Sequence, residues 1–437
     1  MRKTTFIFTG DSFITRKLPE YGYAGFDVIE EIIKQHDVRF NNLEITVHDN
    51  EGYPDAQSGG TWAMTEPQIL ESLLRYGFNI FNTANNHAMD YGHGGLLATI
   101  RHLRDRSVAF SGTGATLAEA AAPAYIETSC ARVAIVGACS TCFPSAVAGN
   151  ARIDMKGRPG LNPIRFDTIY KVRKEYFDVL NEVAAITNMN AERNKSIKNG
   201  YTPPLPEDRF NFGGLIFMQS EVDELCTIPL EKDAERIFTS VEEAKRQADY
   251  ALVSIHAHES LDGNDAVPAN FIKEFAHLCI DKGADAIIGH GPHELRGVEI
   301  YKGKPIFYSL GNFIFQTETV TLQPADAYEK HSMSNLTTVG QYMSNRSKNG
   351  TRGYNVQPNI WQSVMAGMTA VDGNITQICF YPITLHMEEP RSRKGWPSIM
   401  KSEDMKDAGV LRYLASLSKP FGTKLRIENN RAYIDLA

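Results

Sequence analysis

Histidine, carboxylate and asparagine residues recur along this sequence at places where a run of apolar residues ends. Imidazoles and carboxylates bind the transition metals used in hydrolysis, and an amide oxygen can join them. A divalent metal held in this way lowers the pKa of a bound water molecule and stabilises charge on the group under attack. The candidate metal ligands are Asp11, Glu44, Asn86, His256, His290 and His293.

His87 adjoins Asn86 and is the candidate catalytic acid. In a tight turn its ring points away from its neighbour, so it could donate a proton to a leaving group or a hydrogen bond to developing charge. Asp90 lies three residues further on and could orient this imidazole. Asp90 could equally cap the helix that follows it. We expect His87 and Asp90 to be the catalytic pair.

Three further residues are candidates for substrate binding. Arg16 lies shortly after Asp11 and could bind an anionic group through two hydrogen bonds, or it could be a solvated surface charge. His258 shares a strand face with His256 through the two-residue period of a strand, so it could line the pocket or serve the structure. Glu259 follows it directly and is the third candidate.

The segment Gly289-His-Gly-Pro-His293 is the most specific local pattern. Its two glycines and its proline favour a compact turn in which the two histidines can converge on one ion. The alternative is a pair of solvent-exposed histidines in a loop.

The elements that position these residues are expected to alternate between strands and helices, which indicates an α/β fold. A polar candidate follows each of five expected strands, and the carboxyl edge of a parallel sheet is where ligands bind. These strands are Phe6–Thr9, Val38–Leu43, Phe78–Thr83, Tyr250–Ile255 and Ala284–Gly289. One sheet edge would therefore collect the candidate ligands.

The 437 residues are expected to form a single domain, 1–437, with two atypical parts. The stretch 148–248 is rich in Asn, Lys, Arg, Glu and Pro and is expected to be a surface insertion. The C-terminal part, 316–437, is expected to complete or cover the core.

The composition narrows the class of protein. With 42% hydrophobic and 22% charged residues and a net charge of -7, the chain resembles an ordinary globular protein and not a nucleic-acid binder. No apolar run approaches the ~20 residues of a membrane span, and the first residues do not match a signal peptide. We therefore expect a cytoplasmic protein without a membrane span, whose oligomeric state the sequence leaves open.

Several motifs, taken together and in order, resemble those of the CapA family, which is named for poly-γ-glutamate capsule synthesis. That family is itself similar to the calcineurin-like metallophosphatases. The resemblance covers roughly Thr5 to Phe315. It rests on Gly10-Asp11, Asn42-Leu-Glu44, Ala84-Asn-Asn-His87 with Asp90-Tyr-Gly92, His256-Ala-His-Glu259, Gly289-His-Gly-Pro-His293 and Tyr308-Ser-Leu-Gly-Asn-Phe313.

The resemblance implies a four-layer α/β/β/α sandwich of the metallo-dependent phosphatase type. It also implies that Asp11, Asn86, His256, His290 and His293 bind metal, that Glu44 takes the place of the bridging acid, and that His87 is the catalytic acid. The chain departs from the family patterns where Asp11-Ser-Phe13 lacks a histidine and where His256-Ala-His-Glu259 replaces His-Trp-Gly-x-Glu, so Glu259 has no secure counterpart. The expected cofactor is therefore a divalent transition metal (Mn, Zn or Fe), and the site could hold either one ion or two.

Three functions remain open from the sequence. The first, which we expect, is a metal-dependent phosphoesterase that uses a metal-activated water on a small anionic substrate, and the other two are its alternatives. The second is an accessory protein that binds a γ-glutamyl or other anionic polymer during its biosynthesis. The third is a metal-dependent amidase or peptidase acting on γ-glutamyl bonds, because the same activated water can attack an amide carbonyl.

Overall fold

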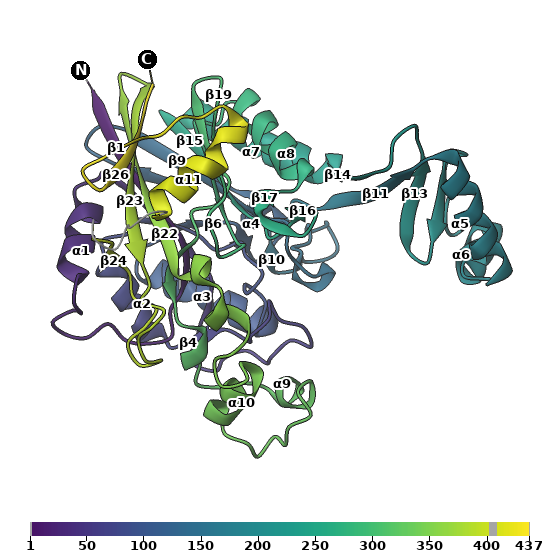
Figure 1. The fold of residues 1–437 in the computed structure, drawn as a ribbon, viewed down its shortest axis with the longest axis horizontal. Coiled ribbons are helices and arrows are strands. Elements are labelled where there is room, and N and C mark those ends of the chain that lie inside the picture. The colour runs from purple at the N-terminus through teal and green to yellow at the C-terminus, as the bar shows by residue number, and fades with distance from the viewer. Residues whose placement is uncertain (1, 402–408, 437) are drawn as a thin grey trace.

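The computed structural model describes residues 2–401 and 409–436, and within them the largest sheet has ten strands (Figure 1). Its main path runs β25-β26-β23-β22-β1-β2-β5-β6, with β21 beside β1 and β24 beside β23. The first-half strands are β1 (Lys3–Phe13), β2 (Val38–Leu43), β5 (Ile80–Asn82) and β6 (Ala109–Ser111), all mutually parallel. The later strands are β21 (Asn312–Phe315), β22 (Gln362–Val371), β23 (Asn374–Thr384), β24 (Ser398–Ile399), β25 (Arg426–Glu428) and β26 (Arg431–Asp435).

A second sheet has six strands in the order β19-β20-β18-β15-β9-β8. Its four central strands are parallel, and an antiparallel strand closes each edge. The bounds are β8 (Ala124–Glu127), β9 (Arg132–Cys139), β15 (Tyr250–His256), β18 (Ala286–His290), β19 (Val298–Tyr301) and β20 (Lys304–Phe307).

One apolar core joins the two sheets. Phe6 and Phe8 of β1 belong to the same buried cluster as Leu252 of β15 and Phe307 of β20. The rings of Phe8 and Phe307 lie 5.8 Å apart. Parallel strands in such sheets are buried on both faces, which explains why the sequences of these strands are almost continuously apolar. The two parallel sets of strands are thus held at fixed positions relative to each other.

Helices cover the outer faces. Apolar residues of α1 (Phe26–Lys34) and α2 (Pro67–Leu74) share a second cluster with the large sheet. Apolar residues of α7 (Glu231–Gln247) and α8 (Asn270–Asp281) share a third with the six-stranded sheet. The remaining helices of the main body are α3 (Gly92–Asp105), α4 (Leu117–Ala121), α9 (Ala325–Glu329), α10 (Val339–Arg346) and α11 (Val410–Ser418). The expected α/β class is confirmed.

Residues 166–229, called the lobe below, project from the main body (Figure 1). The lobe has its own sheet, in the order β12-β13-β11-β14, and two helices. Its elements are β11 (Phe166–Val172), α5 (Lys174–Ile186), α6 (Ala191–Lys198), β12 (Arg209–Phe212), β13 (Leu215–Gln219) and β14 (Glu224–Pro229). The lobe is shorter than the stretch 148–248 that the composition singled out. Helix α7, which falls within that stretch, packs on β9 and β15 and so belongs to the main body.

Residues after 316 contribute to the large sheet. Strand β22 pairs antiparallel with β1, from Lys3 opposite Val371 to Phe8 opposite Ala366, and β23 and β26 extend the sheet further. Helix α11 adds Val410, Leu411 and Leu414 to the core between the sheets. Within the described ranges, none of the helices combines the length and apolar character needed to cross a membrane.

Candidate metal centre

The polar candidates meet where the two sheets place their strand ends. His256 and His290 are the last residues of the neighbouring strands β15 and β18 and pair with each other in register. Asp11 lies near the end of β1, and Glu44 directly follows β2. Each of these side chains is 0% exposed. Parallel strands from two sheets therefore bring four polar groups into one buried place.

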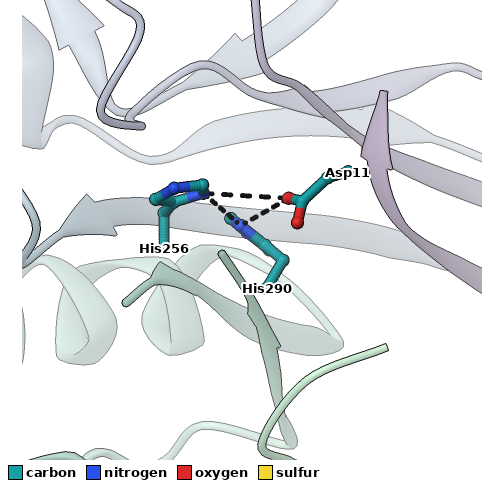
Figure 2. Close-up of side chains that lie close together, drawn as sticks. All are labelled: Asp11, His256 and His290. Carbon is teal, nitrogen blue, oxygen red and sulfur yellow. Dashed lines mark hydrogen bonds and ion pairs between the residues drawn. The ribbon is translucent and has the colours of Figure 1, made fainter. Parts of the chain in front are cut away.

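Asp11, His256 and His290 form the tightest group (Figure 2). The Nδ1 atoms of the two histidines lie 3.0 Å apart. Oδ1 of Asp11 lies 3.5 Å from Nδ1 of His290 and 3.8 Å from Nδ1 of His256. The three side chains point toward one another, so their lone pairs can reach a single ion.

Glu44 gathers a second set of nitrogens. Its Oε1 atom lies 3.8 Å from Nε2 of His256 and 3.8 Å from Nε2 of His293. His293 reaches back to Asp11, with Nδ1 3.7 Å from Oδ2, and Nε2 of His258 lies 3.0 Å from Nε2 of His256. We call the six residues that make up this group the histidine–carboxylate cluster: Asp11, Glu44, His256, His258, His290 and His293.

Unpaired buried atoms test whether these residues fit a metal. Among the described residues, neither carboxylate oxygen of Glu44 has a hydrogen-bond donor, and Oδ1 of Asn86 also has none. A buried polar atom without a partner costs about 1–3 kcal/mol, and more when it is charged. A divalent cation would satisfy the oxygens of Glu44 and the facing imidazole nitrogens together. The mixed nitrogen and oxygen donors suit Zn, Mn or Fe.

Burial sets the protonation of the cluster. It raises the pKa of Asp11 to about 7, and burial, followed by the charges of Asp11 and Asp90, raises the pKa of Glu44. Burial lowers the pKa of His290 to about 3 and that of His293 to about 4. Neutral imidazole is the form that binds metal, so these histidines are ready ligands. A cation would favour the ionised form of both carboxyl groups.

His87 is held by Asp90 and faces the cluster. Its Nδ1 lies 2.6 Å from Oδ2 of Asp90, and its Nε2 lies 4.0 Å from Oε1 of Glu44. The backbone N–H groups of Gly59 and Ala63 donate to Asp90 at 3.0 and 2.7 Å. With Asp90 accepting at Nδ1, Nε2 is the nitrogen available to a reacting group. The structure thus brings His87 and Asp90 together as a hydrogen-bonded pair.

Other polar residues orient the ligands, and sequence reasoning did not assign them this role. Ser254 Oγ lies 2.7 Å from Nε2 of His290, and Asn312 Oδ1 lies 3.0 Å from Nδ1 of His293. Asn42 Nδ2 donates to Oδ1 of Asp11 at 2.7 Å. Ser254 precedes His256 by two residues and Asn42 precedes Glu44 by two. The period of a strand was therefore the signal that could have found these two.

Gly291 explains why the final histidine pair converges. Its φ is 123°, and a Cβ placed there would lie 2.9 Å from the backbone nitrogen of Ala257. Its N–H donates to Oδ2 of Asp11 at 3.0 Å. His293 has φ 63°, which is uncommon for a residue with a side chain. The turn expected from the Gly-Pro pattern thus bends tightly enough to bring both imidazoles to Asp11.

The three candidates for substrate binding have different positions. His258 joins the cluster, as described above. Glu259 accepts hydrogen bonds from the hydroxyl groups of Ser140 and Thr141 at 2.6 and 2.9 Å, which ties it to the loop after β9. Arg16 is not brought to the cluster. Its guanidinium donates to backbone carbonyls of Ser392 and Lys394, because the chain after Phe13 turns toward the C-terminal part.

Comparison with known proteins places this geometry in a family. A family model described as "Bacterial capsule synthesis protein PGA_cap" matches residues 5–317, which include every member of the cluster. The chain belongs to this family. This match confirms the resemblance to the CapA family, and the family is metallophosphatase-like.

Two kinds of relative bear on this PGA_cap protein. The protein y4sH of Sinorhizobium fredii, whose name states no activity, is 30% identical over 99% of this chain and 93% of its own length. The "PGA biosynthesis protein CapA" of Bacillus subtilis is 24% identical over 71% of this chain and 62% of its own length. The "Capsule biosynthesis protein CapA" of Bacillus anthracis is 24% identical over 77% and 66%, respectively.

Proposed function

We propose that this PGA_cap protein is a metal-dependent hydrolase that cleaves a bond in an anionic, γ-glutamyl substrate. The observation that carries the proposal is the unpaired carboxylate of Glu44, enclosed by imidazoles of His87, His256 and His293. We infer that the two packed sheets and their covering helices form the α/β/β/α sandwich of the metallo-dependent phosphatases. Proteins of that type place a hydrolytic metal at the strand ends of both sheets.

The ligands would be Asp11, Glu44, Asn86, His256, His290 and His293, around one or two ions. Asp11 and Glu44 each lie within 3.8 Å of a nitrogen of His256 and a nitrogen of His293, so both acids would hold an ion together with these imidazoles. A bound Mn, Zn or Fe ion supplies an activated water and polarises the bond under attack. His258 extends the nitrogen-rich wall beside His256.

His87 would act as the proton donor in the bond cleavage. Water adds to the acyl carbon, the C–N bond breaks, and the amine leaves with a proton from Nε2 of His87, which the attacking water's proton replaces. Asp90 holds the ring in the required orientation. Such proton transfer contributes about 10²–10⁴-fold to a rate.

A γ-glutamyl amide is the favoured substrate because relatives are named for PGA and capsule biosynthesis. A small phosphoester is the alternative substrate, since the same geometry would serve phosphoryl transfer to water. The word biosynthesis in the names of these relatives also favours a second function, in which the protein binds the growing anionic polymer without cleaving it. The buried His87–Asp90 pair, which binding alone does not require, argues for turnover.

The experiment is a metal analysis joined to a substrate screen. Purified protein is assayed for Mn, Zn and Fe, then tested on γ-glutamyl amides and on phosphoesters, beside His290→Ala. We expect bound metal and cleavage of γ-glutamyl amides, both lost in His290→Ala. Cleavage of phosphoesters alone would overturn the substrate class. Tight polymer binding without cleavage, in metal-replete protein, would favour the accessory function.

A further inference from the structure

A cavity of about 190 Å³ lies between α10 and the segment that precedes β22. A water molecule takes about 30 Å³ of liquid volume, so the cavity has room for a small organic group. Its lining combines charge with apolar surface. The residues that matter here are Glu318, Met343, Arg346, Arg352, Tyr354 and Trp361.

Tyr354 connects the cavity to the cluster. It lines the cavity, and its ring lies 5.7 Å from the His293 ring in an edge arrangement. Burial and the charge of Glu44 raise the pKa of Tyr354, while Arg346 lowers it. The charges of Glu44 and of Arg346 thus both act on this phenol.

Arg346 makes a second connection. Its Nη1 donates to the hydroxyl of Thr61. In the same loop, the carbonyl of Gly59 accepts from Asn86 Nδ2 at 3.2 Å, and the N–H of Gly59 donates to Asp90. A Cβ at Gly59 would lie 2.8 Å from the His87 ring, so this loop touches the catalytic pair. Two residues of the cavity lining therefore connect it to the site: Tyr354 contacts His293, and Arg346 contacts the loop beside His87 and Asp90.

The charges in the cavity are unbalanced. Among the described residues, Arg346 and Arg352 form no ion pair with a carboxylate, and Arg352 Nε donates only to the backbone carbonyl of Arg346. The one acid in the lining, Glu318, is already paired with Lys394 and lies 3.5 Å from Arg391. An arginine fork matches a planar carboxylate, and two guanidinium groups that have no carboxylate partner among the described residues leave the cavity cationic.

We propose that this cavity is the subsite for the free α-carboxylate of a γ-linked glutamyl residue, with Arg346 as its main ligand and Arg352 as its second. The apolar side chains of Met343, Tyr354 and Trp361 suit the methylene groups between that carboxylate and the γ-carbonyl. This inference rests on the proposed function, because it takes the bond attacked at the cluster to be the γ-amide. It assigns the specificity of the protein to side chains outside the metal centre.

The test compares two ligands that differ only in the α-carboxylate: γ-glutamyl-p-nitroanilide and γ-aminobutyryl-p-nitroanilide. Calorimetry measures their binding to the metal-replete full chain carrying His87→Gln, in which turnover should be slow enough for binding to be measured. The same pair is then measured with Arg346→Met added. Arg393→Met is the matched control, because Arg393 is an exposed arginine paired with Glu389. KM and kcat of the proteins with native His87 are measured in parallel.

We expect the γ-glutamyl ligand to bind tenfold or more tightly than its analogue, on the order of one hydrogen bond between charged groups. Arg346→Met should remove this preference by raising KM for the γ-glutamyl substrate with little change in kcat, and Arg393→Met should keep it. The proposed subsite is wrong if Arg346→Met keeps the preference for the γ-glutamyl ligand, or if the protein with native Arg346 shows no such preference. Discrimination without any turnover would overturn the hydrolase and leave the subsite standing. Turnover without discrimination would do the reverse.

Discussion

The histidine–carboxylate cluster and the lobe differ in how many parts of the chain build them. The cluster takes residues from position 11 to position 293, and it lies where two sheets share one core. The lobe is one continuous segment with its own four-stranded sheet, and α6 buries none of its residues. The cluster should therefore respond to damage anywhere in the main body, whereas the lobe should be able to change with little effect on the cluster.

The largest expected effect lies inside the cluster region. His87→Gln should lower kcat about 10²–10⁴-fold, the usual contribution of a positioned proton donor. Metal content should stay the same, because His87 is not among the proposed ligands: its Nδ1 is engaged by Asp90, and its Nε2 faces Glu44 at 4.0 Å. Steady-state kinetics with elemental analysis of the same sample measure both. Loss of metal in this variant would show that His87 is a ligand.

Core substitutions in the two regions should separate them next. Phe8→Ala should destabilise the main body by about 3–5 kcal/mol, because a large buried ring is lost between the sheets. Phe210→Ala removes the ring that contacts Phe177 and Phe217 in the lobe. Denaturant unfolding measures the first, and limited proteolysis within 166–229 measures the second. Equal loss of bound metal in both variants would contradict the separation.

A smaller effect is expected from a residue that orients a ligand. Ser254→Ala removes the hydroxyl 2.7 Å from Nε2 of His290. Partners of this kind typically contribute 10–100-fold to metal affinity. A competition titration with a chelating dye gives the affinity, and Ser240→Ala, on α7, is the matched control. An unchanged affinity would mean that backbone geometry alone orients His290.

The smallest effect on the cluster should come from removing most of the lobe. Residues Thr168 and Thr227 face each other on β11 and β14, so a two-residue Asn-Gly turn can replace 169–226. The retained strand ends keep Phe166 stacked on Phe271 of α8. We expect unchanged metal content and a lower stability only of the strand ends. Loss of metal on this deletion would show that the lobe supports the centre.

The sequence predicted the cluster better than its surroundings, for physical reasons. The expected strand ends at His256 and His290 are off by one residue, since each histidine is the last residue of its strand. Strand β1 runs on through Asp11 to Phe13, because Asp11 still pairs with Asn42 and Asn312. A buried polar residue within a strand looks, in sequence, like the end of one.

Long-range packing decided what sequence could not predict. The apolar face of α7 packs on the main body, and composition alone could not separate this helix from the lobe before it. Arg16 lies close to Asp11 in sequence, yet the chain direction after β1 carries it to Ser392 and Lys394. Arg346 lies more than two hundred residues from His87, and only the fold brings it to the loop beside that residue.

The most direct test of the metal centre is a thermal unfolding experiment with defined metal loading. Chelator-treated protein is melted alone and after addition of Mn, Zn or Fe, beside the same experiment on Glu44→Leu, which removes the unpaired carboxylate. Because a ligand that binds only the folded state raises the melting temperature, we expect a clear rise for the native protein. The rise should be largely lost in Glu44→Leu. A metal-free protein whose melting temperature none of these ions changes would contradict the account.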